Sequence, residues 1–389
     1  MLFHRAIKKR FTIFEELKCC QMPFLKKIIV QNFRNIELQE LSFSPNINCI
    51  CGNNGEGKTN LLDAVHYLSL TKSVFGLSDK FNFRHGCDSF AISGTYGMES
   101  GLETKIAVSV QDGAEKKVRR DDKPYSRLSD HIGVIPIVMV CPSDSAMVSE
   151  SGEERRRFVN GVLSQMDREY LSGLQQYNKL LLSRNKLLKD GVSDGAYLSV
   201  LDQKMESVAG SVFEKRTRFV ERLIPLVSDL YGTISGGTER ISISYRSDLQ
   251  KGLLFDLLQG SIEKDRVLKY TSVGLQRDDF IFELDGYPIR KCGSQGQQKS
   301  FLVALKFAQY EIMKQAYGFP PVLLLDDLFD KLDMNRVSNL LKMVAGNDFG
   351  QIFLTDCNKV RLNSIVKGLT GESAFFETVG GKFSDGRRE

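Results

Sequence analysis

Gly52-Asn53-Asn54-Gly55-Glu56-Gly57-Lys58-Thr59 is the stretch that decides the fold. Its spacing, G-x-x-x-x-G-K-[ST], is that of the phosphate-binding P-loop. Glycine has no Cβ atom, so such a loop can adopt strained backbone angles and turn its N–H groups inward around an anion. We expect Lys58 to reach the β- and γ-phosphates of a nucleoside triphosphate, and the Thr59 hydroxyl to bind Mg²⁺.

The sequence on either side supports this interpretation. Ile47–Cys51 is a short apolar run typical of a buried strand, and apolar residues recur at helical spacing from Leu61 to Leu68. A helix that begins after the loop would direct its N-terminus at the phosphates. A chance glycine-rich turn is the alternative, and the full spacing between a strand and a helix makes it a minor one.

The second half of the site is expected far downstream. The run Pro321-Val322-Leu323-Leu324-Leu325-Asp326-Asp327 is apolar and ends in two carboxylates. A buried parallel strand has this composition, and α/β sheets place ligands at the C-terminal ends of such strands. Asp326 is therefore the expected Mg²⁺ partner of the Walker B type, and Asp327 could orient the attacking water. A capped strand end is the alternative, favoured equally if the run stood alone.

A glycine-containing loop, Gly293-Ser294-Gln295-Gly296-Gln297-Gln298-Lys299, precedes a further helical pattern. Ser294, Gly296 and Gln297 resemble the signature loop of ABC-type ATPases. In that family the loop of one subunit caps the γ-phosphate held by the P-loop of the other, and a serine and a glycine at a helix N-terminus can bind an anion. An ordinary polar N-cap is the alternative, and it would be favoured if the motif were isolated.

Together these motifs resemble the RecF family of bacterial recombinational-repair ATPases, which is related to the SMC heads. The resemblance runs from about Met22 to about Asn358. The matching segments are Phe33-Arg34-Asn35, Gly52–Asn60, Glu153–Arg157 with Phe158, Thr271–Gly274 with Arg277-Asp278-Asp279, Ser294–Lys299 and Leu325–Asp333.

The resemblance implies an α/β fold, an ABC-type P-loop ATPase head with an inserted helical arm. The expected divisions are a non-core extension over 1–21, the N-terminal half of the ATPase over 22–150, the arm over 151–236, the C-terminal half over 237–380 and a polar, disordered tail over 381–389. Helical spacing of apolar residues over 152–230 independently indicates the arm.

The resemblance also implies cofactors and partners. ATP with Mg²⁺ would join two copies face to face, and the homodimer would clamp double-stranded DNA near single-strand gaps. It would help the RecO and RecR proteins to load recombinase, and weak hydrolysis would reopen the dimer. No membrane partner and a cytoplasmic location are expected.

Further residues take expected roles from the family alone. Arg34 is similar to a family arginine near the nucleotide, and Asn60 closes the matched P-loop segment. Thr355-Asp356 stands where relatives place a γ-phosphate sensor. The chemistry of Arg277-Asp278-Asp279 does not indicate a role. Basic residues over 116–123 and along the arm are candidates for phosphate contacts, with a solvated surface as the alternative.

Composition sets looser bounds. Lys+Arg 53 against Asp+Glu 48 leaves a formal charge of +5, which does not by itself indicate nucleic-acid binding. The cysteines have neither C-x-x-C pairing nor zinc spacing, so reduced thiols are expected. No apolar run reaches transmembrane length.

Two other classes share the head. An OLD-type nuclease would need a further domain with clustered acids, and a transporter ATPase subunit would lack the long helical arm.

Overall fold

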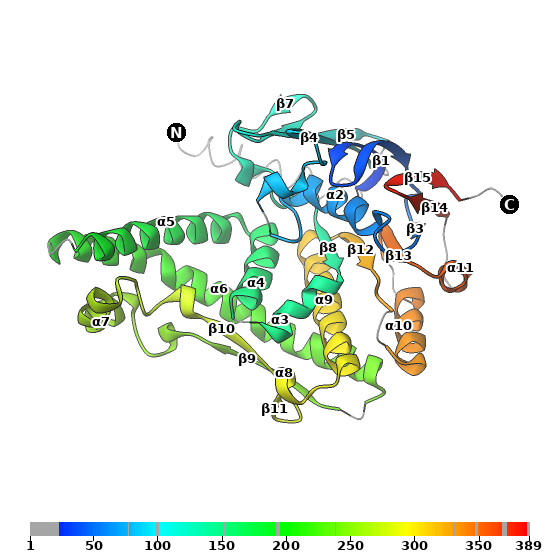
Figure 1. Ribbon diagram of the computed structural model, residues 1–389. Coiled ribbons are helices and arrows are strands. Elements are labelled where there is room, and N and C mark those ends of the chain that lie inside the picture. Colours follow the sequence, from blue (N-terminus) through cyan, green and yellow to red (C-terminus); the bar gives the residue numbers. More distant parts are fainter. Residues whose placement is uncertain are drawn as a thin grey trace, which may run out of the picture. The chain divides into compact units, whose positions relative to one another are not determined.

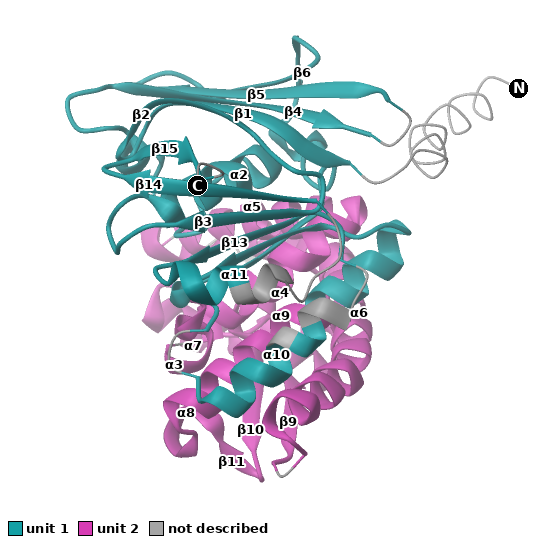
Figure 2. Cartoon of the chain, turned by 90° about the vertical axis from the view of Figure 1, so that its right-hand side faces the viewer, with its two compact units in different colours: residues 1–143, 309–389 teal, residues 144–308 magenta. Residues whose placement is uncertain are grey.

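The computed structural model describes residues 23–76, 78–98, 101–150, 152–191, 195–237, 239–329, 332–346, 349–367 and 372–386. The fold is α/β, as expected (Figure 1). The chain forms two compact units, shown in different colours in Figure 2. Unit 1 comprises residues 1–143 and 309–389, and unit 2 comprises residues 144–308.

Unit 1 contains a mostly parallel sheet in the order β15-β14-β3-β13-β12-β8. These strands are β3 (Ile47–Cys51), β8 (Ile137–Val140), β12 (Val322–Asp326), β13 (Ile352–Asp356), β14 (Ser373–Val379) and β15 (Lys382–Asp385). All residues of β8, β12 and β13 are buried. These strands are therefore almost continuously apolar, whereas a half-exposed strand would alternate apolar and polar residues. The predicted strands before the P-loop and before Asp327 are confirmed, and β13 lies between them.

An antiparallel sheet in the order β2-β1-β4-β5-β6-β7 forms the other layer of unit 1. Its strands are β1 (Phe24–Phe33), β2 (Ile36–Ser42), β4 (Ser89–Gly97), β5 (Glu103–Gln111), β6 (Lys117–Arg120) and β7 (Lys123–Pro124). Helix α2 (Lys58–Leu70) packs against strands of both sheets, which buries it on nearly every side (Figure 2). This explains why its apolar residues do not form a single stripe.

Unit 2 is mainly helical. It contains α3 (Ala146–Ser149), α4 (Gly152–Met166), α5 (Arg168–Asp190), α6 (Gly195–Ser235), α7 (Leu254–Leu268), α8 (Ile289–Cys292) and the first part of α9 (Gln295–Tyr317). Asp167 caps α5 by accepting a hydrogen bond from the Tyr170 N–H, and Gly191 ends it in the left-handed region at φ 66°. The helical region expected from residue 152 onward is confirmed.

Strands β9 (Ile241–Arg246), β10 (Asp279–Leu284) and β11 (Tyr287–Pro288) form a sheet of their own in unit 2. Residues 237–308 were expected to belong with the ATPase, whereas the compact unit that contains them also contains the helical arm. The remaining elements are α10 (Met334–Gly346), α11 (Lys359–Lys367), η1 (Asp79–Asn82), η2 (Leu128–Asp130), η3 (Pro142–Ser145), η4 (Asp248–Gln250) and η5 (Leu275–Arg277).

The expectation of a disordered tail after Gly380 is wrong for residues 382–385. These residues form β15, which pairs antiparallel with β14 and buries Phe383. Gly380 and Gly381 both have positive φ, as a tight hairpin turn requires. The Gly-Gly pair was the available signal, and the polar residues around Phe383 concealed it.

Residues 1–21 and the pair Asp330-Lys331 lie outside the described residues. Among the helices that are described, none is long and apolar enough to cross a membrane. The described cysteines carry free thiols, namely Cys49, Cys51, Cys87, Cys141, Cys292 and Cys357.

Candidate nucleotide site

The P-loop connects β3 to α2 and depends on glycine at two close approaches. A Cβ atom on Gly52 would lie 2.6 Å from the Thr378 Cγ2 atom. One on Gly57 would lie 2.8 Å from the Asn35 Nδ2 atom, and Gly57 also has φ 106°. The Cβ atom on Gly52 would also meet the Thr378 backbone, and the positive φ of Gly57 is one that other residues rarely adopt, so both positions favour glycine.

Lys58 is held by the loop itself. Its Nζ atom donates to the carbonyl oxygens of Gly52 at 2.7 Å and Asn53 at 3.1 Å. The side chain is buried, whereas Asn53, Asn54 and Gly55 are exposed along the rim of the loop. The ammonium group is thus fixed inside the curve of the loop, as expected for a lysine that binds phosphate oxygens.

The two predicted Mg²⁺ ligands meet. The Thr59 hydroxyl donates to Asp326 Oδ2 at 2.7 Å, although 267 positions separate them in the chain. Thr355 donates to Asp326 Oδ1 at 2.6 Å, and Asp326 is fully buried. A hydroxyl beside a buried carboxylate supplies the oxygen ligands that Mg²⁺ prefers, with substrate phosphates and water completing its shell. Thr59 and Asp326 therefore fit this ion.

Asp327 directly follows β12 with φ 43°, in the left-handed region that aspartate tolerates better than most residues. Its N–H donates to the Thr355 hydroxyl at 3.1 Å. Thr355 therefore orients both acids, one through its donated hydrogen bond and one through the bond it accepts. Asp356, which follows Thr355 in the chain, forms an ion pair with Arg361 at 2.7 Å.

Arg34 and Asn60 contact each other at the start of α2, with Arg34 NH1 3.3 Å from Asn60 Oδ1. The Arg34 guanidinium also forms an ion pair with buried Asp63 at 2.9 Å and donates to Ser73. Burial lowers the pKa of Arg34 and raises the pKa of Asp63, while the ion pair opposes both shifts. The contacts of the Arg34 guanidinium with Asp63 and Ser73 therefore hold α2 in place.

Residues near the C-terminus also hold the P-loop, and no sequence motif predicted them. The Glu56 carbonyl oxygen accepts from the Thr378 hydroxyl at 2.9 Å and from the Gly381 N–H at 2.9 Å. The Glu56 carboxylate accepts from the Gly380 N–H. The turn between β14 and β15 therefore stabilises the P-loop, and no motif connects these distant segments.

Ser294, Gly296 and Gln297 lie in unit 2, at the start of α9. The Ser294 hydroxyl accepts from the Gln297 N–H at 3.2 Å, while the Gln297 side chain accepts from the Ser294 N–H at 2.7 Å. This reciprocal pair is a capping box. The Gly296 carbonyl accepts from the Ser300 hydroxyl at 2.8 Å. The N-cap alternative is thus realised, and a role toward a second subunit stays a hypothesis.

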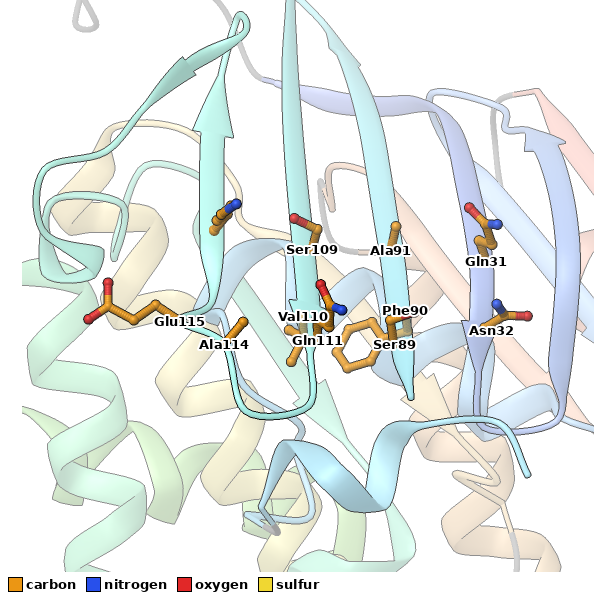
Figure 3. Close-up of a pocket in the computed structure, with 11 residues that line it drawn as sticks. Gln31, Asn32, Ser89, Phe90, Ala91, Ser109, Val110, Gln111, Ala114 and Glu115 are labelled. Carbon is orange, nitrogen blue, oxygen red and sulfur yellow. The ribbon is translucent and has the colours of Figure 1, made fainter. Parts of the chain in front are cut away.

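The basic group at 116–123 divides by environment. Lys116 forms an ion pair with Asp79 at 2.8 Å and donates to the Thr71 carbonyl at 2.6 Å, so it is structural. Lys117 borders a hollow of about 220 Å³ on the antiparallel sheet. Figure 3 shows this hollow with other residues that line it. Glu115 and neutral side chains such as Gln31 also line that hollow, and none of the predicted nucleotide residues does.

The fold and the joined P-loop and Walker B residues define an ABC-type P-loop ATPase head. A family profile described as the RecF/RecN/SMC N terminal domain matches residues 24–370. The DNA replication and repair protein RecF of Porphyromonas gingivalis is 43% identical over 359 residues, which cover 92% of this chain and 99% of that protein. The protein of the same name from Phocaeicola vulgatus is 43% identical, covering 93% of this chain and 98% of its own. The chain belongs to the RecF family.

Solved structures agree. The structure of the recombination mediator protein RecF-ATP in the RecFOR pathway has a TM-score of 0.84 at 28% identity and covers 94% of this chain and 98% of its own. The Smc head domain derived from Pyrococcus furiosus has a TM-score of 0.54 at 14% identity, over 94% of this chain and 96% of its own. At that identity the likeness concerns the fold alone.

Proposed function

We propose that this chain is an ATP-dependent DNA-binding protein of recombinational repair and replication restart. One observation carries the proposal: Thr59, Asp326 and Thr355 form one hydrogen-bonded group at the P-loop of a RecF-family chain. The RecF-ATP structure is that of a relative, and here it supports ATP as the nucleotide.

Each site residue has a proposed task. The P-loop N–H groups and Lys58 bind the phosphates, and Thr59 and Asp326 hold Mg²⁺. Asp327 orients the attacking water. Arg34 and Asn60 fix the first turn of α2 beside the nucleotide. Hydrolysis is weak, and its purpose is to end a bound state.

That bound state is an ATP-dependent homodimer, in which Ser294, Gly296 and Gln297 of one subunit meet the ATP of the other. The dimer binds double-stranded DNA near single-strand gaps in the cytoplasm and works with RecO and RecR in loading recombinase. Each subunit is only mildly basic, with a formal charge of +5, so two must be held together to neutralise enough phosphates.

Ser294→Arg tests this proposal. The bulky cation should block the meeting of subunits and leave the P-loop intact, so ATP binding stays near wild type while dimerisation fails. DNA affinity should fall with it and weaken steeply with salt, because phosphate contacts release counterions. Labelled duplex DNA is titrated with ATP at two salt concentrations, and sedimentation reports the oligomeric state.

Two further variants serve as controls. Lys58→Ala removes the phosphate-binding cation and should lose ATP binding and dimerisation together. Ser207→Arg adds the same charge on an exposed face of α6 and should behave like wild type. If Ser294→Arg stays monomeric yet binds DNA as tightly as wild type, the ATP-gated clamp is wrong.

A further inference from the structure

The motif Arg277-Asp278-Asp279 has two residues that the packing of unit 2 explains. Asp278 is fully buried and accepts hydrogen bonds from Arg216 on α6 and Tyr245 on β9. Asp279 accepts two hydrogen bonds from Arg155 on α4, at 2.8 and 3.2 Å. The two carboxylates therefore join the helices to the small sheet, and neither explains Arg277.

Arg277 is exposed and borders a pocket of about 260 Å³ in unit 2. The pocket is lined by Gly152, Glu153, Arg156, Arg246, Gln276, Arg277 and Asp279. Its three arginines come from three elements, α4, β9 and η5. A Cβ atom on Gly152 would lie 2.8 Å from Asp279 Oδ1 and 3.0 Å from Arg156 NH1, so glycine keeps this space open.

The pocket has an excess of positive charge. Its two acids already have arginine partners outside the lining, because Asp279 pairs with Arg155 and Glu153 pairs with Arg157 at 3.5 Å. Arg246 reaches Asp279 only at 3.7 Å and is 69% exposed. Burial, and then the nearby charge of Arg216, lower the pKa of Arg156, while Asp279, Glu153 and Asp278 oppose that shift.

We propose that this pocket binds a phosphate group of the nucleic-acid backbone, with Arg277 and Arg246 as its mobile donors and Arg156 as its fixed one. Arg156 is fixed because its NH1 donates to the Asp278 carbonyl at 2.8 Å. Guanidinium groups match phosphate oxygens in geometry and are weakly hydrated. Donors from three elements suit a tetrahedral oxyanion better than a planar carboxylate. The inference rests on the proposed DNA-binding function and adds the surface that makes the contact.

The test uses Arg277→Gln and Arg246→Gln in the full chain with ATP. The plot of log affinity against log salt has a negative slope, and each substitution should make that slope shallower by about 1. Each should also weaken duplex binding about tenfold near 0.1 M salt, whatever the DNA sequence. Arg218→Gln is the matched control, because Arg218 is an exposed arginine of the same unit that pairs with Glu214 at 3.4 Å. It should change neither quantity.

Inorganic phosphate provides a second arm. At matched ionic strength it should compete with DNA in the wild type more strongly than chloride does, and lose this advantage in the Arg246→Gln/Arg277→Gln double variant. If the wild type does not bind duplex DNA at all, the proposed function itself fails. If the wild type binds but the variants keep its affinity and salt slope, the pocket proposal is overturned, and an acidic protein segment becomes the ligand to test.

Discussion

At the scale of single residues, His131 is a buried base with one unsatisfied nitrogen. It is fully buried, and its Nε2 atom lies 2.6 Å from the Leu68 carbonyl oxygen, which can only accept. Nε2 therefore carries the proton. Nδ1 is buried without a hydrogen-bond partner among the described residues, so a second proton there would be poorly stabilised. Burial accordingly lowers the pKa of His131, and nearby Arg120 adds to this.

We expect the stability of unit 1 to fall as the pH drops below about 6.5, the ordinary histidine pKa. Below that pH the histidine of the unfolded chain binds a proton while folded His131 does not. The free energy of unfolding therefore falls by up to about 1.4 kcal/mol per pH unit until the lowered pKa of His131 is reached. Urea unfolding at pH 7.5, 6.5 and 5.5 measures this. His131→Gln should remove this share of the pH dependence, and equal pH dependence in both proteins would contradict it.

At the scale of elements, the acids of one motif hold α4, α6 and the small sheet together. Arg216 is buried, and Asp278 is the carboxylate that compensates its charge. The Arg216 guanidinium also donates to the Leu275 carbonyl at 3.1 Å and to Asn160 at 2.9 Å. An intact buried ion pair changes the stability of the fold little, whereas removing one partner destabilises the fold strongly.

Asp278→Ala should therefore destabilise unit 2 by about 3–5 kcal/mol, because it leaves a guanidinium buried without a counter-charge. Urea unfolding followed by circular dichroism measures the loss. Glu214→Ala, which breaks the exposed pair with Arg218, should cost under about 1 kcal/mol. A similarly small cost for Asp278→Ala would show that the network does not link these elements.

At the scale of the whole molecule, Asp327 should decide how long the proposed ATP-bound dimer lasts. Asp327→Asn keeps a residue that tolerates its left-handed backbone, but the amide cannot activate water as a carboxylate does. We expect ATP binding near wild type, much slower turnover and a persistent dimer in sedimentation after ATP is added. Asp88→Asn, at an exposed position, is the control. Rapid hydrolysis by Asp327→Asn would remove Asp327 from the catalytic step.

The sequence by itself determined the features that depend on neighbours in the chain. The P-loop spacing, the buried strand before Asp327 and the helical region after residue 152 were all predictable, because backbone freedom and apolar periodicity act locally. That Thr59 and Asp326 lie together was predictable from two motifs of known chemistry, and their binding of Mg²⁺ stays a proposal.

Only the tertiary structure decided which distant residues support those motifs. Thr378 and Gly381 hold Glu56, Thr355 orients both acids, and Asp278 compensates Arg216. The strand β15 formed because Phe383 could be buried against its surroundings in unit 1. Such contacts join segments tens to hundreds of residues apart, and a hydrogen bond or buried ion pair between them leaves no periodicity or spacing in a single sequence.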